Sequence, residues 1–520
     1  MLIEIERIKK SLKKENIVPI AKAFSCDTLT PVSAFLRLQE KSKRSFFLES
    51  VEGGERLGRY CFLGLKPFET LRIRNGLFLR ERDGKVVEGS SKFNPFHSLK
   101  LYLKKYKSLT FSELPPFCGG AIGYVGHESI YHIEDLPFNP KNKNLLEDSA
   151  HLMLFRDVIA FDRIKNRMII ISNIFLEEES LEEGIKKAEA KIEELYESLF
   201  FGNFKRHGKN KTAISEKYIE MRLDFNKAYD SLPNEKEEDF FNEGLFGREE
   251  FYRAVKTIKS HIRKGDIFQC VLSDRFSFNI KADPFSIYRS LRSISPAPYL
   301  FYLSLGEEEF LLGASPERLV KVENGIIQTC PIAGTRPRGK TKEKDKKFEK
   351  ELLMSVKEKA EHLMLVDLGR NDVGRVAKSG SVKVTQFMEV EKFSNVMHLV
   401  SHIEGKLSYS KSAWDALGSC FPAGTLSGAP KIKALEIIDK LEKRPRGPYG
   451  GAIIYYDFSG NLDSCINIRS LRVKKNKAFI QAGAGIVYDS RAKSEYMEIY
   501  HKSKAVREAL SMAHFLEEQR

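Results

Sequence analysis

Residues 451–489, GAIIYYDFSGNLDSCINIRSLRVKKNKAFIQAGAGIVYD, contain runs of β-branched and aromatic residues separated by short polar turns. This pattern predicts successive strand hairpins. Similar runs occur earlier in the chain, at residues 44–50, 71–87, 154–172 and 299–315. Because hairpins dominate and strands do not alternate strictly with helices, the sequence predicts an α+β fold with antiparallel sheets rather than a doubly wound parallel sheet.

Helical patterns lie between these hairpins and at the end of the chain. We expect helices over roughly residues 177–199, 248–264 and 342–367, and a closing helix from about residue 492. A polar, charge-rich stretch separates two halves of the chain. We therefore predict three parts, which are an N-terminal α+β region (1–200), a charged linker (201–242) and a C-terminal catalytic region (243–520).

The composition is that of a globular protein, since 42% of the 520 residues are hydrophobic and 30% are charged. No apolar run approaches the ~18–20 residues of a membrane span, and the N-terminus is unlike a secretory signal, so we expect a cytoplasmic protein. The seven cysteines form no CxxC pair, which argues against a disulfide framework. The net charge of +15 comes from Lys and Arg interleaved with Glu. We therefore expect neither a membrane nor nucleic acid as a partner.

Two local patterns are partly similar to known site motifs. The segment AGTLSGAPK (423–431) is similar to a phosphate-binding loop but lacks its GK[ST] ending and its spacing. His398 and His402 have the spacing of two metal ligands on a helix. Their surroundings alternate like a strand, which would separate the two side chains by ~13 Å. We therefore expect neither a nucleotide triphosphate nor a shared zinc ion.

Two acidic pairs have helical spacing, Glu358 with Glu361 and Glu495 with Glu498. Glu361 shares a helical stripe with apolar residues, and a buried carboxylate needs a partner or a metal. A solvated surface face remains the alternative, because Glu498 and Lys502 have the spacing of an exposed ion pair. Two such pairs brought together would suit Mg²⁺, which takes one or two carboxylates and keeps waters.

Several segments have the composition of an anion site. In CPIAGTRPRGK (330–340) a Gly-Thr pair is surrounded by basic residues and stiffened by two prolines, which predicts an ordered loop. Glycines cluster in GPYGG (447–451) and QAGAGIV (481–487), where a backbone could approach a ligand. Arg469 lies among alternating residues and could project from a strand toward a carboxylate. Each segment alone could be a structural turn, but together they favour a site for a small polyanion.

The chain resembles the chorismate-utilising enzymes. The resemblance rests on GDIFQ, GASPERL, PIAGTRPRG, AEHLMLVDLGRND, FPAGTLSGAPK, GPYGGAI, INIRS, QAGAGIVYDS and EYMEIYHKSKA, in this order and spacing. It extends from DTLTPVSAFLRL near Asp27 to Lys504, and within the family it is strongest with the large subunits that form anthranilate. The family fold is an α+β sandwich of large antiparallel sheets with helices packed outside, in keeping with the hairpins.

The resemblance also implies roles for particular residues. It makes Glu361 and Glu498 the ligands of Mg²⁺, with Glu358 and Glu495 nearby. It implies catalytic roles for Gln269, Glu317, His398 and Thr425. The residues that it assigns to chorismate, a substrate with two carboxylates, are Gly334, Thr335, Tyr449, Arg469, Gly483, Ala484, Gly485 and Lys502.

Two positions distinguish the reactions within this family. Water-adding isochorismate enzymes resemble this chain but carry a lysine in the GDIFQ segment, where this chain has Gln269, which cannot act as a base. Aminodeoxychorismate synthases carry a nucleophilic lysine in PIKGT, where this chain has Ala333. Ammonia needs no deprotonation to attack, so the pair favours direct amination at C2. The alternatives are an aminodeoxychorismate synthase component, a water-adding enzyme, and a catalytically silent partner of a glutaminase.

For that reaction the resemblance implies that Glu317 protonates the departing 4-hydroxyl of chorismate while Thr425 positions that end of the ring. His398 then assists the elimination of pyruvate, which leaves anthranilate, the first committed product of tryptophan biosynthesis. None of the seven cysteines lies in the Gly-x-Cys-x-Gly setting of a glutamine amidotransferase. The resemblance therefore implies a separate glutaminase subunit that supplies ammonia from glutamine.

A final pair of segments, FFLES (46–50) and SPAPYLFYL (295–303), resembles the tryptophan feedback site of the family. Structural core is the alternative for both segments. Leu300 stands where Met is usual, but it keeps an apolar wall for an indole ring. The residues expected to contact the inhibitor are Glu49, Ser50, Pro298, Tyr299 and Leu300.

Overall fold

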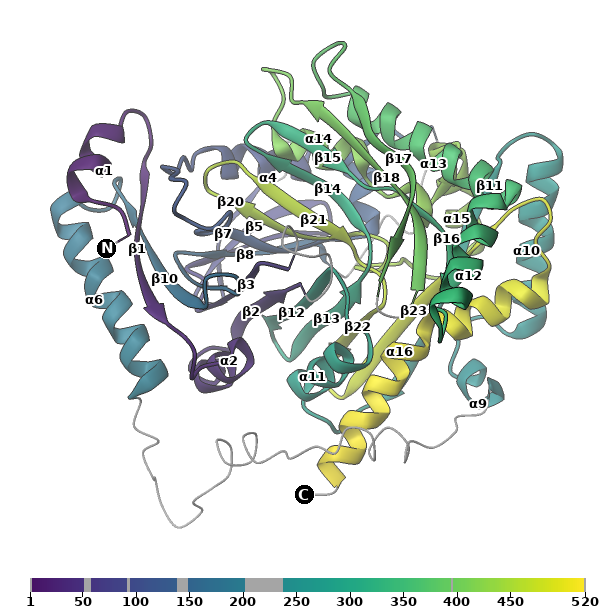
Figure 1. Ribbon diagram of the computed structural model, residues 1–520, viewed down its shortest axis with the longest axis horizontal. Helices are drawn as coiled ribbons and strands as arrows, with labels where there is room; N and C mark the ends of the chain where they lie inside the picture. Colours follow the sequence, from purple (N-terminus) through teal and green to yellow (C-terminus); the bar gives the residue numbers. More distant parts are fainter. Residues whose placement is uncertain are drawn as a thin grey trace.

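The computed structural model describes residues 2–50, 58–90, 94–137, 148–201, 237–393 and 396–518. The hairpins of residues 451–489 are present, but they belong to two different sheets (Figure 1). β20 (Ala452–Asp457) and β21 (Leu462–Ile466) pair in one sheet, whereas β22 (Ser470–Lys474) and β23 (Lys477–Ile486) pair in the other. The short link at residues 467–469 therefore carries the chain from one sheet to the next.

The first sheet combines strands from both halves of the sequence. Among the described residues it has eleven strands. Their order is β1 (Ile17–Ser25), β10 (Arg167–Phe175), β9 (Asp157–Asp162), β3 (Tyr60–Leu65), β2 (Arg44–Glu49), β12 (Tyr299–Gly306), β13 (Glu309–Ser315), β22, β23, β11 (Gln269–Asn279) and β19 (Gly428–Ala429).

The second sheet is built in the same way. Its order is β16 (Ile332–Pro337), β18 (Val396–Lys406), β15 (Ile326–Thr329), β14 (Arg318–Glu323), β21, β20, β7 (Gly120–Val125), β8 (Asp148–Phe155), β4 (Glu69–Arg74), β5 (Leu77–Arg82) and β6 (Lys85–Ser90), and β17 (Lys383–Lys392) pairs with β18. Neighbouring strands of both sheets pair antiparallel, as in the β20–β21 and β22–β23 hairpins. The predicted α+β class with large antiparallel sheets is confirmed.

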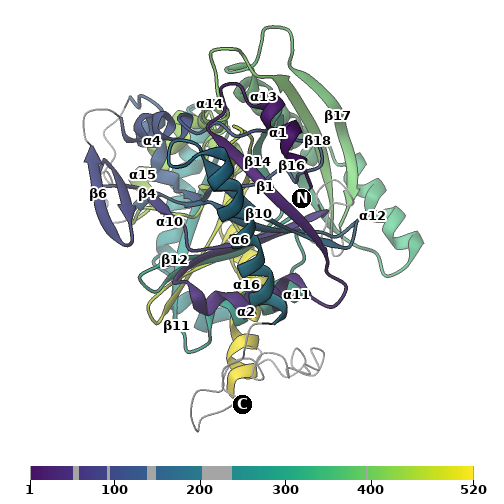
Figure 2. The same ribbon diagram turned by 90° about the vertical axis from the view of Figure 1, so that its left-hand side faces the viewer.

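Helices lie outside the sheets (Figure 1). They are α1 (Ile5–Ser11), α2 (Pro31–Leu38), α4 (Pro95–Lys104), α5 (Ile130–Ile133), α6 (Leu181–Phe200), α9 (Glu237–Asn242), α10 (Arg248–Arg263), α11 (Pro284–Ile294), α12 (Lys342–Met354), α13 (Val356–Gly374), α14 (Ala413–Cys420), α15 (Lys431–Leu441) and α16 (Ala492–Glu518), with 3₁₀ turns η1 (Gln39–Lys41), η2 (His127–Ser129) and η3 (Gly424–Leu426). In Figure 2, α6 faces the viewer and crosses β1 and β10. No helix in the described part of the chain is long and apolar enough to cross a membrane.

Two helix predictions need correction. The pattern at 342–367 predicted one helix, but the chain breaks at Ser355, whose backbone is extended and whose hydroxyl accepts a hydrogen bond from the Glu358 N–H. Ser355 thereby caps α13, which is why the break is stable despite the favourable residues on both sides. The helix predicted from 177 begins at Leu181, because Ser180 caps it through the Glu183 N–H.

Aromatic residues from distant segments fill the space between the sheets. Phe46 on β2 packs edge-to-face against Phe117 and Phe155, with ring centroids 6.1 and 4.7 Å apart. All three side chains are fully buried. Such T-shaped pairs contribute about 0.5–1.5 kcal/mol beyond their buried area. They tie the N-terminal strands to the common core.

The division into parts 1–200, 201–242 and 243–520 stays a prediction, and strands of both long parts share both sheets. Most of the predicted linker, residues 202–236, lies outside the described residues. Its last six residues form α9. Phe240 of α9 is fully buried and stacks on Phe276 with centroids 4.0 Å apart, so this end of the predicted linker belongs to the folded core.

Candidate active site

A cavity of about 560 Å³ is lined by residues of β16, β18, β23, α13 and α16. It brings together segments that are far apart in the sequence. The predicted site residues that line it are Gln269, Glu317, Gly334, Thr335, Glu358, Glu361, His398, Thr425, Tyr449, Arg469, Gly483, Gly485, Glu495, Glu498 and Lys502. The structure thus places the predicted catalytic, substrate and metal residues around a single cavity, with one exception.

The exception is Ala484, whose side chain belongs to a buried cluster with Leu272 and Ile486. Successive residues of a strand point to opposite faces, so Gly483 and Gly485 line the cavity and Ala484 does not. Any contact that Ala484 makes with a ligand is therefore through its backbone. A Cβ atom at 485 would lie 2.7 Å from Nε2 of Gln269, so a larger residue there would displace the Gln269 amide.

The link between the sheets holds several walls of the cavity together. Ile466 N–H donates to the Glu317 carbonyl at 3.0 Å, and Asn467 exchanges backbone hydrogen bonds with Gly450 and Gly451 at 3.0 and 2.8 Å. Arg469 lies in this link with a left-handed φ of 52°, not on a strand as predicted. This unusual backbone at a cavity-lining arginine is typical of a functional position.

Glu317 and Thr425 form the acid end of the cavity. The Thr425 hydroxyl donates to Oε1 of Glu317 at 3.1 Å. Burial raises the pKa of Glu317 to about 8, against the opposing effects of the Thr425 hydrogen bond and the Lys502 charge. The carboxyl group is therefore protonated at neutral pH and can donate a proton.

His398 lies on the opposite side, on β18. Its Nδ1 is 2.9 Å from the Gly334 carbonyl and 3.1 Å from the Thr335 hydroxyl. A carbonyl oxygen only accepts, so Nδ1 carries a proton, and whenever the ring is neutral its lone pair is on Nε2. Gly334 has a φ of 61°. A Cβ atom there would lie 2.8 Å from Leu352. The segment 330–340, predicted as a loop, forms edge strand β16 at this point.

Two cations face the acid end. Arg469 donates through Nη1 to the Lys502 carbonyl at 2.9 Å, and Lys502 donates to the Gly483 carbonyl at 3.0 Å. Lys502 also pairs with Glu498 at 2.6 Å, as the spacing suggested. Burial lowers the pKa of Arg469. A buried guanidinium has lost part of its hydration. A bound carboxylate would restore favourable interactions to the charge and so would be stabilised there.

Four carboxylates on α13 and α16 form an acidic wall. Burial raises the pKa of Glu361, and the charges of Glu358 and Glu498 raise it further. Burial likewise raises the pKa of Glu495, with a contribution from Glu498. Within the described ranges, no group of three or more His, Cys, Asp and Glu has the geometry of a complete metal site. The four carboxylates offer only oxygen donors, and they repel one another when no cation is present. Such a set fits a hard cation that takes one or two of them and completes its coordination with water or substrate.

Gln269 and Ala333 complete the lining. Gln269 is buried, and its Oε1 has no hydrogen-bond partner among the described residues. An orphan acceptor in a cavity is costly unless a ligand or water donates to it. Ala333 on β16 contributes only a methyl group, so this part of the wall has no nucleophile of its own.

A buried ionic cluster supports the segment that carries Tyr449. The Arg446 guanidinium donates to both Glu442 oxygens at 2.9 and 2.7 Å, and to the Leu426 and Val271 carbonyls at 2.6 and 2.9 Å. The Glu128 carboxyl accepts the N–H groups of residues 446 and 447 at 2.6 and 2.9 Å. Burial raises the pKa of Glu128 to about 7. Glu128 comes from the first 200 residues, so both halves build the site.

A second, smaller cavity of about 120 Å³ contains the predicted inhibitor residues. Glu49, Ser50, Pro298, Tyr299 and Leu300 all line it. Glu49 is buried and accepts from Tyr288 at 2.8 Å, and it also pairs with Arg163 and Arg292. The carboxylate therefore links β2 to α11 and to the turn that follows β9.

Sequence reasoning missed several lining residues. Lys357, Gln481 and Ser490 face the main cavity, and Asp463 and Tyr455 line the small one. Lys357 lies one residue before Glu358 in the first turn of α13, where its charge lowers the pKa of Glu361. Gln481 and Ser490 lie inside a quoted motif, but nothing in the sequence marked Lys357, Asp463 or Tyr455 as site residues.

Comparisons with known proteins agree with this geometry. The model of the family of chorismate binding enzymes matches residues 44–508. The chain therefore belongs to the chorismate-binding enzymes. It is 43% identical to anthranilate synthase component 1 of Acetivibrio thermocellus over 98% of both chains. It is 40% identical to the protein of that name from Thermus thermophilus, over 96% of this chain and 99% of the relative.

Solved structures extend the likeness to three dimensions. Anthranilate synthase component I from Streptococcus pneumoniae superposes with a TM-score of 0.70 and 35% identity, covering 93% of this chain and 98% of the other. The menaquinone-specific isochorismate synthase from Escherichia coli superposes with a TM-score of 0.67 at 17% identity, covering 95% of each chain, which shows the shared fold alone.

The Arg446 cluster gives a stability prediction. We expect Arg446→Lys to lower the free energy of unfolding by about 2–4 kcal/mol, because lysine keeps the charge but cannot replace the bidentate fork inside the core. Urea unfolding followed by far-ultraviolet circular dichroism measures the change. The matched control is Arg444→Lys at an exposed position, expected to stay within about 0.5 kcal/mol. Equal midpoints for both variants would contradict the role of the cluster.

Proposed function

We propose that this chain converts chorismate and ammonia into anthranilate and pyruvate, as the chorismate-binding subunit of an anthranilate synthase. The observation that carries the proposal is the single cavity in which protonated Glu317 and His398, oriented through its Nδ1, lie with two cations, beside Gln269 and Ala333. A lysine in place of Gln269 would favour addition of water, and a lysine in place of Ala333 would favour formation of aminodeoxychorismate. The full-length relatives named anthranilate synthase component 1 support the same conclusion.

Chorismate is a dianion, so its two carboxylates need positive partners. Arg469 and Lys502 supply fixed cations next to the backbone of Gly483. Gly334, Thr335, Tyr449 and Gly485 complete the proposed substrate contacts, with Ala484 contributing backbone only. Binding the ring between these groups and Glu317 holds the 4-hydroxyl at the acid end.

In the first step ammonia attacks C2, the two ring double bonds shift, and the C4–O bond breaks. Glu317 donates its proton to the departing hydroxyl, which leaves as water. The Thr425 hydroxyl bonds the same carboxyl and holds it at this end of the ring. Positioned proton donors of this kind contribute roughly 10²–10⁴ in rate.

In the second step Nε2 of His398 removes the C2 proton. The C–H electron pair closes the aromatic ring, and the C3–O bond breaks to release enolpyruvate, which becomes pyruvate. The Gly334 carbonyl fixes the required tautomer through Nδ1–H. Formation of the aromatic ring makes this step downhill.

The acidic wall fits Mg²⁺. We propose Glu361 and Glu498 as its ligands, with Glu358 and Glu495 close by. When bound, the ion would neutralise a substrate carboxylate and the repulsion among these four side chains. Lys502 holds Glu498 in place through the 2.6 Å ion pair.

Gln269 is the residue that we expect to contact ammonia. The unpaired Oε1 of Gln269 can accept an N–H of the incoming nucleophile without acting as a base. We propose that a separate glutamine amidotransferase subunit supplies the ammonia and that the assembly is cytoplasmic. We also propose tryptophan as an inhibitor in the small cavity, where Glu49, Ser50, Pro298, Tyr299 and Leu300 would surround it.

One assay tests the proposed reaction. Chorismate, Mg²⁺ and ammonium salt are expected to give fluorescent anthranilate, and a chelator is expected to stop its formation. Adding tryptophan tests the small cavity in the same cuvette. A product that carries the amino group at C4 and keeps the enolpyruvyl group at C3 would instead identify an aminodeoxychorismate synthase component. Glutamine-dependent turnover by this chain alone would refute the separate glutaminase.

The proton held by Glu317 predicts a pH dependence. Its carboxyl is active when protonated, so kcat/KM at a fixed concentration of free NH₃ should be flat below pH 8 and fall about tenfold per unit above it. The control is Thr425→Val, which removes a hydrogen bond that lowers the pKa, so the alkaline limb should move to higher pH. A wild-type profile without a limb near pH 8 would exclude Glu317 as the acid.

The role of His398 predicts a trapped intermediate. We expect His398→Met to aminate chorismate but to eliminate pyruvate roughly 10²–10⁴ times more slowly, because the C2 proton has no acceptor. Chromatography and mass spectrometry should then show an aminated, non-aromatic species that still carries the enolpyruvyl group. Anthranilate formation at the wild-type rate would show that another group takes the proton.

A further inference from the structure

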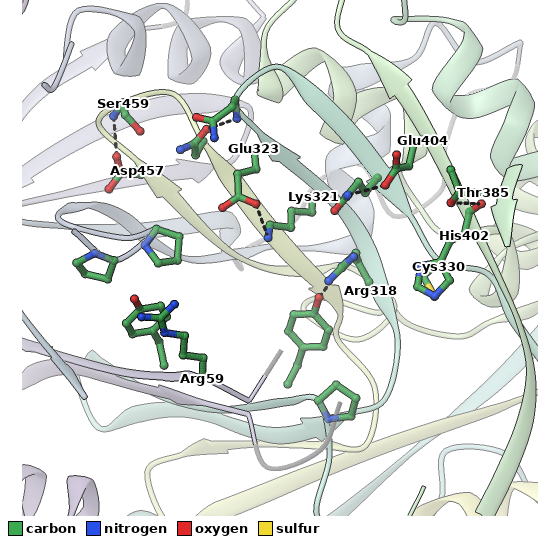
Figure 3. A pocket seen from close by; sticks show the side chains of 18 of the residues that line it. Arg59, Arg318, Lys321, Glu323, Cys330, Thr385, His402, Glu404, Asp457 and Ser459 are labelled. Atoms are coloured by element: carbon green, nitrogen blue, oxygen red, sulfur yellow. Dashed lines mark hydrogen bonds and ion pairs between the residues drawn. The ribbon is translucent and has the colours of Figure 1, made fainter. Parts of the chain in front are cut away.

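A larger cavity of about 1150 Å³ lies beside the candidate active site (Figure 3). Pro316 and Ile332 line both cavities, so the wall between them is one chain thick. The large cavity also shares Pro298 and Tyr299 with the small pocket. Small-molecule sites typically have volumes of roughly 300–1,000 Å³, so this cavity is large enough to admit a small molecule. The proposed reaction leaves this space unused.

A thiol, an imidazole and a carboxylate meet at one side of this cavity. Cys330 Sγ lies 3.9 Å from Nε2 of His402, and the same nitrogen lies 3.2 Å from Oε1 of Glu391. All three residues line the cavity, and Figure 3 shows Cys330 against the His402 ring. The contacts with Cys330 and Glu391 raise the pKa of His402 to about 10. The imidazole is therefore protonated at neutral pH, and its Nε2 faces both the Glu391 carboxylate and the thiol sulfur.

The other cysteines are in different surroundings. Cys61, Cys118, Cys270, Cys420 and Cys465 are buried. Cys26 is partly exposed like Cys330, but burial and the carboxylates of Asp27 and Asp162 raise its pKa. A positive neighbour favours the thiolate and a negative one disfavours it. Cys330 and Cys26 thus form a matched pair of partly exposed thiols, one beside the His402 imidazole and the other beside carboxylates.

We propose that Cys330 is a covalent modification site that reacts with low-molecular-weight disulfides by thiol–disulfide exchange. The Cys330 thiolate attacks one sulfur of the disulfide, a new S–S bond forms, and the old S–S bond breaks. The leaving thiolate takes up a proton from water. Cys330 is thereby oxidised and one half of the small disulfide is reduced, so the step needs no further reagent.

The modified position is coupled to the active site by two strands. Cys330 lies in the short link between β15 and β16, and His402 lies on β18. Further along the same ladder, Ile332 pairs with Val400 and Thr335 pairs with His398. An adduct that separates Cys330 from His402 pushes on the strands that carry Thr335 and His398, whose 3.1 Å contact belongs to the proposed catalytic machinery. We therefore expect the mixed disulfide to lower the rate of anthranilate formation.

The labelling experiment uses the full chain and oxidised glutathione, with peptide mass spectrometry after rapid quenching at pH 7. Cys330 is expected to react about 10-fold faster than Cys26. His402→Asn should slow labelling of Cys330 about 10-fold and leave Cys26 unchanged. Equal rates at the two cysteines, or no effect of the histidine substitution in a variant with native circular dichroism, would overturn the proposal. If that variant does not fold, the direct comparison of Cys330 with Cys26 decides alone.

An activity experiment tests the coupling. The mixed disulfide should reduce anthranilate formation in proportion to occupancy at Cys330, and dithiothreitol should restore it. Cys330→Ser should keep its basal activity and resist oxidised glutathione, whereas Cys26→Ser should behave like the wild type. Full activity of the modified protein would overturn the coupling. This experiment rests on the proposed reaction, but the labelling needs no substrate, so failure of one is distinguishable from failure of the other.

Discussion

The short link at residues 467–469, where the chain passes from one sheet to the other, is the constraint on which the site depends. Its backbone and the adjoining end of β21 hydrogen-bond to Glu317 on one side and to Gly450 and Gly451 on the other. Ala314 on β13 donates to the carbonyl of Arg469 at 3.1 Å. The acid, the segment after Tyr449 and the arginine thus share one rigid connection. Any shift between the sheets would separate these groups, so the pairing of the sheets itself sets their geometry.

The acidic and basic side chains of the candidate active site occupy different parts of its wall. The acidic wall lies on two helices, whereas Arg469 comes from the link and Lys502 from the next turn of α16 after Glu498. A dianionic substrate therefore meets cations at the sheet side and repulsion at the helix side. The carboxylates cannot contact the substrate favourably unless their own charge is neutralised. Glu317 lies apart from these helices, and burial rather than repulsion between carboxylates raises its pKa.

Much of the fold followed from local pattern, because hairpin runs and helical stripes are short-range features. The helix break at Ser355 and the left-handed Arg469 did not, since each depends on a cap or on a crossing between sheets that only the tertiary fold creates. The gathering of the site residues followed from motif resemblance, not from spacing. The Arg446 cluster could not be foreseen, because Glu128 reaches it from more than 300 residues earlier.

The chain that separates the two larger cavities includes Pro316, Glu317 and Arg318, where β14 begins. In extended chain, neighbouring side chains face opposite ways, so Glu317 points to the active cavity while Arg318 points to the other. Arg318 is held at 2.7 Å by the Tyr299 hydroxyl, which also faces the small pocket. Glu317 is therefore fixed from three directions, at its backbone by the sheet link and through Arg318, and at its carboxyl by Thr425. A proton donor whose position is set this tightly loses little entropy on binding substrate, which is the condition for an acid that acts only in the transition state.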